Sequence, residues 1–259
     1  MVACALVLAL AGATTLYSAE EGLKQAKATV RSVHGTVEYQ DKENGPWVPV
    51  KPNMKFPAGI TVRTGADGTA DISVNGTASA VRLTNNTTVV IPTMYYIGSA
   101  REGDTTTMLN LKSGGIIGNV KKISANSRYE IITPNGVAGI RGTDFAVTTW
   151  KNPDGSDPTT AYSIVGTVLF SAVINGVPQT FTLHTGQSVT VGGTVTPVVQ
   201  TTGSDTQQSL QFQSQNINNG APGGAGGPGA GPGKGNPNPP PPSTPPPFIG
   251  GPPQGGSAS

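Results

Sequence analysis

Short segments that alternate between apolar and polar residues recur along most of this chain, and turn-forming residues separate them. Val, Ile and Thr are common in these segments, and such β-branched side chains suit the pleated surface of a sheet. The dipeptides Asp67-Gly68, Asn75-Gly76 and Asn175-Gly176 fall between segments and tolerate the positive φ angles of tight hairpin turns. Strands that are separated by turns every ~8–12 residues predict an all-β body.

The predicted strands are short, with about 4–6 residues each, and glycines are frequent between them. These features favour a solenoid-like or roll-like stack of strands, with a β-sandwich as the alternative. The chain shows no strict sequence period, which argues against a regular β-helix. The best helical candidate is the brief polar segment Glu20–Ala28.

The first residues predict a secretory signal. Val2–Tyr17 is an apolar run rich in Ala and Leu, of the length expected for a signal peptide and short for a membrane span. Small residues follow it, so we place the signal peptide at residues 1–19, with cleavage before Glu20. A cut after Ser18, a start codon further upstream and a buried first helix are the alternatives. Cys4 is the only cysteine, which excludes an intramolecular disulfide.

The other end of the chain is rich in glycine and proline. Residues 220–259 contain 13 Gly and 13 Pro among 40 residues, far above the globular norm. Such a segment has little apolar surface to bury and does not offset the entropy cost of ordering. The sequence therefore predicts a signal peptide (1–19), a short linker (20–28), an all-β domain (29–199) and a disordered tail (200–259).

Composition and spacing argue against several common chemistries. The net charge is +2 and the arginines are scattered singly, which predicts no nucleic-acid partner. His34 and His184 lack clustered partners, which predicts no metal site. Residues 154–157 resemble the start of a calcium loop but lack its further carboxylates, so we expect a polar hairpin loop.

Catalytic signatures are equally sparse. The sequence contains no nucleophile elbow and no phosphate-binding loop, and its spacing singles out no pair of carboxylates for acid–base work. We predict a protein that is not an enzyme, with no catalytic residue, cofactor, metal or small-molecule substrate. A carbohydrate-active enzyme is the last of the alternatives.

One stretch, Thr133–Val147, reads TPNGVAGIRGTDFAV and predicts a strand, a turn and a second strand. Pro134 has no N–H to donate to a ladder and belongs at a strand boundary, and Asn135-Gly136 allows a tight reversal. Gly139 and Gly142 permit a bulge or a close approach of the backbone.

The second strand of this stretch has an apolar face and a single nearby cation. Phe145 and Val147 share one face, which we expect to be buried, and Asp144 lies on the other. Arg141 stands in an apolar, glycine-rich context. We expect it to pair with a carboxylate such as Asp144 or Glu130, or to donate to backbone carbonyls at a turn.

These residues resemble the signature of the FecR domain family, a Thr-Pro-x-x-x-Ala-x-x-Arg-Gly-Thr-x-Phe-x-Val pattern. The resemblance extends in order from about Val30 to Val191 and includes Gly35–Val37, Trp47–Val50, Val62–Gly65, Arg82-Leu83, Thr88–Ile91, Gly166–Val168, Leu183 and Gly186–Val189. Its signature residues, to which we assign a structural role, are Thr133, Pro134, Ala138, Arg141, Gly142, Thr143, Phe145 and Val147.

The resemblance implies an all-β fold and a periplasmic or extracellular location, and it implies no catalytic residue. In regulators of this family the domain relays a signal from an outer-membrane transporter, and a cytoplasmic segment then acts on an extracytoplasmic-function sigma factor. Few residues precede the domain in this sequence. We therefore expect a stand-alone FecR-like protein without that cytoplasmic segment.

Three functions remain open at this point. The first is an exported module of the bacterial cell envelope, periplasmic or at the cell surface, that binds another envelope or surface protein through strand edges or a convex face. It would not insert into the membrane once its signal is cleaved. The second is a sigma-factor regulator whose N-terminus is truncated here. The third is a structural or adhesive surface protein with the tail as a spacer.

Overall fold

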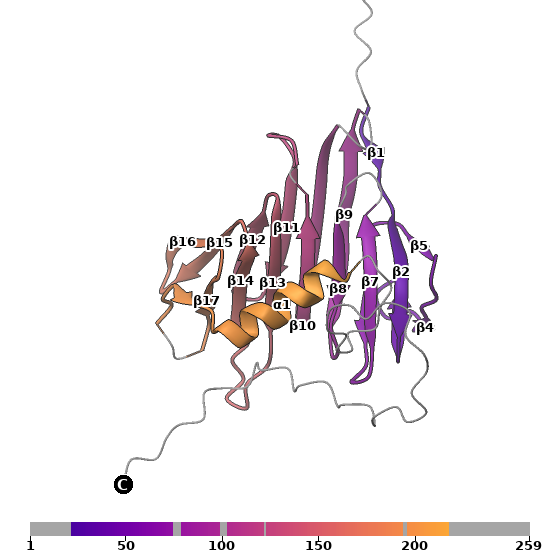
Figure 1. Ribbon diagram of the computed structural model, residues 1–259. Helices are drawn as coiled ribbons and strands as arrows, with labels where there is room; N and C mark the ends of the chain where they lie inside the picture. The colour runs from indigo at the N-terminus through magenta and orange to yellow at the C-terminus, as the bar shows by residue number, and fades with distance from the viewer. Residues whose placement is uncertain (1–21, 75–78, 99–102, 122, 194–195, 218–259) are drawn as a thin grey trace, which may run out of the picture.

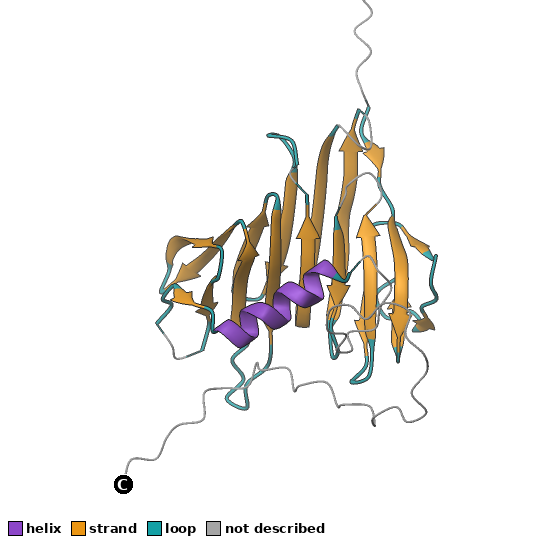
Figure 2. Cartoon of the chain, viewed as in Figure 1, coloured by secondary structure: helices purple, strands orange, loops and turns teal. Residues whose placement is uncertain are grey.

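The structure, a computed structural model, describes residues 22–74, 79–98, 103–121, 123–193 and 196–217. The predicted signal peptide with Cys4, the Asn75-Gly76 turn and the segment 220–259 lie outside these residues. Strands dominate the described part, which confirms the predicted all-β class, and α1 (Ser204–Gln215) is its one helix (Figures 1 and 2).

The strands pair into two sheets that face each other. Sheet A runs in the order β4 (Val48–Pro49), β3 (Val37–Gln40), β6 (Ile60–Thr64), β9 (Thr88–Ile97), β10 (Asp104–Val120), β11 (Arg128–Thr133), β12 (Gly136–Ile140), β15 (Thr167–Ile174) and β16 (Val177–His184), with β1 (Lys24–Gln25) beside the far end of β9. Sheet B runs in the order β5 (Lys55–Phe56), β2 (Ala28–His34), β7 (Thr69–Val74), β8 (Ala80–Leu83), β10, β13 (Thr143–Thr149), β14 (Thr159–Val165), β17 (Gln187–Val191) and β18 (Gln200–Thr201).

Strand β10 belongs to both sheets and joins them. Its first half pairs with β9 and β11 in sheet A, and its second half pairs with β8 and β13 in sheet B. The crossing lies at Gly114, whose φ is +86° and where a Cβ would lie 2.4 Å from the Thr87 backbone. Glycine is therefore required at this corner. We describe the body as a roll of two stacked sheets.

The chain builds the roll by passing repeatedly from one sheet to the other. β2 in sheet B leads to β3 in sheet A, β6 leads back to β7, and β8 leads to β9. Residues alternate along each strand between the interior of the roll and its outer face, so one apolar set fills the space between the sheets. That core includes Val62, Leu111, Ile131 and Phe170, each at most 2% exposed.

Helix α1 lies across the outer face of sheet B, where it contacts β10, β13 and β14 (Figure 1). A second, smaller apolar cluster forms beneath it from Ala80, Ile117, Ala146, Ile164, Leu210 and Ile217. The predicted start of the disordered tail at residue 200 is thus wrong, because β18 and α1 lie within residues 200–217. The physical reason is that Leu210 and Ile217 pack against apolar side chains of sheet B. The sequence of this segment alone does not predict that contact.

Two further expectations are corrected. The helical candidate Glu20–Ala28 is not a helix where it is described, since β1 and the start of β2 occupy it, and the predicted linker 20–28 therefore contributes strands. The strands are also not uniformly short, since β9 has 10 residues and β10 has 17. The predicted Asn175-Gly176 hairpin is confirmed, with φ angles of +52° and +81°.

Candidate protein-interaction site

Most of the signature residues are buried and take part in packing or in hydrogen bonds to the backbone. Thr133, Ala138, Thr143, Phe145 and Val147 are all buried, at no more than 7% exposure. The two threonines use their hydroxyls on the backbone: Thr133 Oγ1 donates to the Gly136 carbonyl at 2.9 Å, and Thr143 Oγ1 donates to the Thr167 carbonyl at 2.8 Å. Pro134 lies exposed in the turn between β11 and β12, at the strand boundary where its sequence context predicts it.

Phe145 is the centre of this part of the core. It points from β13 into the roll and packs over Gly118 of β10, where a Cβ would lie 2.4 Å from the ring. Its ring also meets Tyr129 edge to face, with centroids 6.3 Å apart. Tyr129 is itself 3% exposed, and burial raises the pKa of its phenol well above the usual range. These contacts hold both aromatic rings in the core of the roll.

The connection between β12 and β13 differs from the expectation for Arg141. Gly142 has a φ of +68°, as a glycine at a tight connection predicts. Arg141, however, is exposed, and it makes no hydrogen bond or ion pair with any residue that the structure describes. The expected acceptors are engaged elsewhere: Glu130 pairs with Arg128, and Asp144 accepts from Asn119 and Ser214. The predicted pairing of Arg141 is therefore wrong.

The remaining polar candidates are dispersed. The carboxylate of Asp154 accepts two hydrogen bonds from Ser156, one from its backbone N–H at 2.8 Å and one from its hydroxyl at 2.6 Å. These bonds lower the pKa of the Asp154 carboxyl. The 154–157 segment is the polar loop between β13 and β14. His34 and His184 lie on β2 and β16, in different sheets. Across the described ranges, no three His, Cys, Asp or Glu side chains gather to hold a metal ion.

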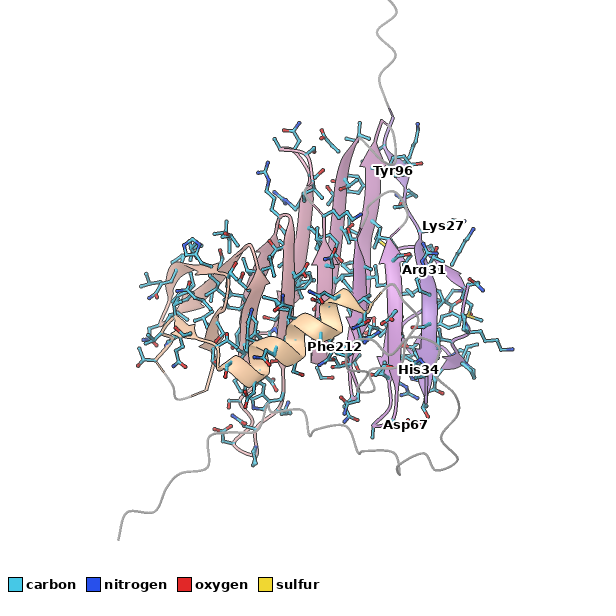
Figure 3. The ribbon with its side chains drawn as sticks, viewed as in Figure 1. Lys27, Arg31, His34, Asp67, Tyr96 and Phe212 are labelled. Carbon is cyan, nitrogen blue, oxygen red and sulfur yellow. The ribbon has the colours of Figure 1, made fainter. Side chains whose placement is uncertain are left out.

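The two ends of the roll differ in how their edges are protected. At the end nearer the N-terminus, the edge strands β4 and β5 have two residues each. β4 contains Pro49 and β5 contains Lys55, and two basic side chains lie nearby: Lys27, which directly precedes β2, and Arg31 on β2 (Figure 3). Short edges that carry proline and lysine resist pairing with another chain. This end is therefore closed to strand addition.

At the other end, sheet A terminates in the eight-residue strand β16, which pairs only with β15 among the described strands. Apolar side chains are exposed around it: Leu169 at 48%, Val173 at 66% and Val177 at 57%. Val198, which precedes β18, is 57% exposed. An exposed apolar group of this kind on a folded domain is typical of a contact surface. We call this region the open end of the roll.

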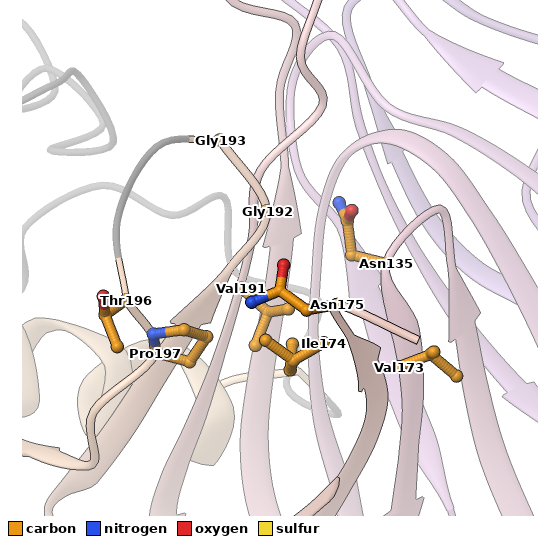
Figure 4. Close-up of a pocket in the computed structure, with 9 residues that line it drawn as sticks. All are labelled: Asn135, Val173, Ile174, Asn175, Val191, Gly192, Gly193, Thr196 and Pro197. Atoms are coloured by element: carbon orange, nitrogen blue, oxygen red, sulfur yellow. The ribbon is translucent and has the colours of Figure 1, made fainter. Parts of the chain in front are cut away.

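A shallow pocket of ≈ 290 Å³ lies in the open end, between the β15–β16 turn and the segment after β17 (Figure 4). Its wall is formed by Asn135, Val173, Ile174, Asn175, Val191, Gly192, Gly193, Thr196 and Pro197. None of these side chains titrates, and the polar ones are amides and one hydroxyl. The described lining can therefore accept apolar groups and hydrogen bonds but contains no titratable acid or base.

Asn135 connects the pocket to the signature stretch. Its amide donates to the Asp157 carbonyl across the loops, and it packs so closely on Gly192 that a Cβ there would lie 2.8 Å away. Gly192 has a φ of +94°. The signature therefore shapes the open end as well as the core.

Sequence reasoning missed the polar contacts that hold α1. Asp71 and Arg82 form an ion pair at 2.7 Å on the outer face of sheet B, with side chains 1% and 5% exposed. Arg82 also donates to the Asn216 carbonyl just after α1, and Ser214 donates to Asp144. Asp71 and Arg82 are 11 residues apart and lie on the neighbouring strands β7 and β8. Their spacing in the sequence does not indicate a contact, because the contact depends on the pairing of these two strands.

In the part of the chain that the structure describes, no helix combines the length and the apolar character needed to cross a membrane. This finding concerns the described helices alone.

Two crystal structures of a "putative anti-sigma factor" from Parabacteroides distasonis ATCC 8503 resemble the fold, each with a TM-score of 0.45 and 10% sequence identity. The similar region covers 58% of this chain and 64% and 63% of the two solved chains. This chain thus spans just under two thirds of their length. A comparison with curated proteins gives no match.

The family comparison covers the middle of the roll. The matched region is residues 60–169, which run from β6 into β15 and include the shared strand β10 and the whole signature stretch. Strand β16 and helix α1 lie beyond it. Residues 60–169 of this chain match the family described as FecR protein, which confirms the resemblance that the sequence motifs indicate.

Proposed function

We propose that this protein is a FecR-type regulatory or signalling module of the bacterial cell envelope that acts by binding another envelope protein, without catalysis. The observation that carries the proposal is the FecR match over residues 60–169, together with an open end that exposes apolar side chains and has a pocket whose described lining contains no titratable side chain. Such a surface suits protein contact.

The open end supports binding because it exposes apolar side chains from separate segments. Val173 and Val177 flank the β15–β16 turn, and Val198 comes from the segment before β18. Between them the pocket offers amide groups of Asn135 and Asn175. A partner that inserts an apolar side chain here would gain burial, about 25 cal/mol per Å² of apolar area, and the amides would orient it.

We also propose that the protein is exported, because Val2–Tyr17 has the length and composition of a signal peptide. N-terminal sequencing of the protein recovered from the cell envelope or medium tests this. A mature chain that begins near Glu20 supports export, and an intact Met1 in the cytosolic fraction contradicts it.

The binding proposal is tested by placing a photo-crosslinking amino acid at Val198 in the full chain, expressed in cells that make the envelope. A matched control carries the same amino acid at Lys55, on the protected end. We expect an adduct with a different envelope protein from position 198 and not from position 55. Equal adducts at both positions, or none at position 198, would contradict a partner at the open end.

A further inference from the structure

The hydrogen-bonding phase of β16 determines which of its backbone groups are free. The β15–β16 hairpin closes with Ile174 opposite Val177 around the two-residue turn Asn175-Gly176. In such a hairpin the residues that flank the turn exchange hydrogen bonds, and every second pair along the ladder does so. The N–H and C=O groups of residues 177, 179, 181 and 183 therefore point to β15, and those of residues 178, 180, 182 and 184 point to the free edge.

At both ends of the free edge the backbone N–H is missing or already bonded, and in the middle the N–H groups are available. Pro178 has no N–H to offer, and its ring takes an edge-facing position, where proline is tolerated. The His184 N–H already donates to Gln187 Oε1 at 2.9 Å. Two donors remain, the N–H groups of Thr180 and Thr182, with the carbonyls of the same two residues beside them. Among the described strands none pairs with this side of β16.

This pattern is symmetric about Phe181. Consider a second copy of β16 that lies antiparallel against the free edge, with Phe181 of both copies on the two-fold axis. Thr180 of each copy then lies opposite Thr182 of the other copy. Each threonine N–H then meets a carbonyl, so the four free donors of the two strands are satisfied. Cross-strand threonine pairs and aromatic pairs stabilise sheets. Phe181 is half-buried and would lie beside Phe181 of the second copy.

Charge does not oppose this contact. β15 and β16 contain no Asp, Glu, Lys or Arg, so two copies meet without like-charge repulsion. The opposite end of the roll carries lysine and proline on its edges, as protected edges do. β16 carries one edge proline, Pro178, but its eight residues include no Asp, Glu, Lys or Arg, and its Thr180–Thr182 edge is the part of the molecule best suited to sheet continuation.

We propose that β16 pairs with β16 of a second copy of this chain, so that sheet A continues from one molecule into the other as a symmetric dimer. The contact is small, because only Thr180 and Thr182 contribute backbone bonds. It therefore belongs with weak, concentration-dependent association. The inference is independent of the proposed envelope partner, since it concerns only copies of this chain.

The test is sedimentation equilibrium of the purified full chain over concentrations from about 1 μM to about 1 mM, a range chosen for interfaces at the low end of the size scale. We expect a reversible monomer–dimer equilibrium. Thr180→Pro and Thr182→Pro, singly and together, remove edge-facing donors without touching the β15 ladder, and each should weaken dimerisation by about tenfold or more.

Thr180→Val and Thr182→Val form the matched control, because valine keeps the backbone N–H and the β-branched shape. They should dimerise within about threefold of the wild type. Circular dichroism and thermal melting establish that each proline variant is folded, and Thr182→Lys, which adds a charge but no proline, serves as a second disrupting variant.

A wild type that stays monomeric at every concentration would overturn the proposal. A dimer that persists unchanged in the folded proline variants would also overturn it, because the contact would then lie elsewhere. Since purified protein alone is used, these results are separate from the crosslinking at Val198, which reports on a different protein.

Discussion

At the scale of single residues, the signature stretch contributes to the core by packing a large side chain against a residue that has none. Phe145 fills the space over Gly118 because residue 118 has no side chain, and its buried position is one that the alternation of Thr143–Val147 predicts. Interiors are packed without room for rearrangement, so both partners of this contact are constrained.

Phe145→Ala should lower the free energy of unfolding by about 3–5 kcal/mol, since it removes a fully buried ring and leaves a cavity. Urea denaturation followed by circular dichroism measures the change. Leu169→Ala, at an exposed position of β15, is the control and should change stability by less than about 0.5 kcal/mol. A loss below about 1 kcal/mol for Phe145→Ala would contradict its place in the core.

Arg141 and Gly142 are neighbours with opposite expected effects. Arg141→Ala should change stability by no more than about 0.5 kcal/mol, because the exposed guanidinium has no partner among the described residues. Gly142→Val should destabilise by more than about 1 kcal/mol, because a β-branched residue is strained at a φ of +68°. Thermal melting of both variants tests the pair. A large loss for Arg141→Ala would show that the arginine makes a structural contact.

At the scale of elements, α1 is held to sheet B by few groups. Leu210 on the helix and Ile217, which follows the helix, are the buried apolar side chains, while Phe212 on the helix remains 40% exposed (Figure 3). Polar contacts complete the attachment: Gln207 donates to the Ile164 carbonyl at 2.6 Å, and Arg82 reaches the carbonyl of Asn216. The helix depends on the sheet, because a 12-residue polar helix is marginal in isolation.

The buried ion pair beneath the end of α1 provides the test at this scale. Arg82→Met should lower stability by about 3–5 kcal/mol, because it leaves the Asp71 carboxylate buried without its partner. The double variant Asp71→Leu, Arg82→Met should recover most of the loss, since it removes both charges. Chemical denaturation measures this double-mutant cycle. Equal losses in the single and double variants would mean that lost packing, and not the unpaired charge, is the cause.

At the scale of the whole molecule, the boundary of the folded body lies beyond the one that composition predicts. The described body continues through β18 and α1 to Ile217, which is fully buried. Limited proteolysis of the full chain should therefore leave a resistant fragment that ends after residue 217. Mass spectrometry of the fragment gives its end. A product that stops near Thr201 would show that α1 is not part of the stable body.

Much of the fold was predictable because it rests on local patterns. Period-two alternation indicates which residues of a strand are buried, as for Phe145 and Val147, and the Asn-Gly dipeptide at 175–176 indicates a tight hairpin. The candidate site was predictable only in kind. Binding through strand edges was a hypothesis from the fold class, and the sequence does not reveal which strand is last in its sheet.

The all-β class, the hairpin at Asn175-Gly176 and the buried face of the signature stretch follow from the chain itself, since each depends on neighbours only a few residues apart. The crossing of β10 between sheets, the seat of α1 and the free edge of β16 depend on contacts between distant segments, such as Asp71 with Arg82 and Ser214 with Asp144. These contacts form only when separate strands lie side by side, and local residue patterns do not encode that arrangement.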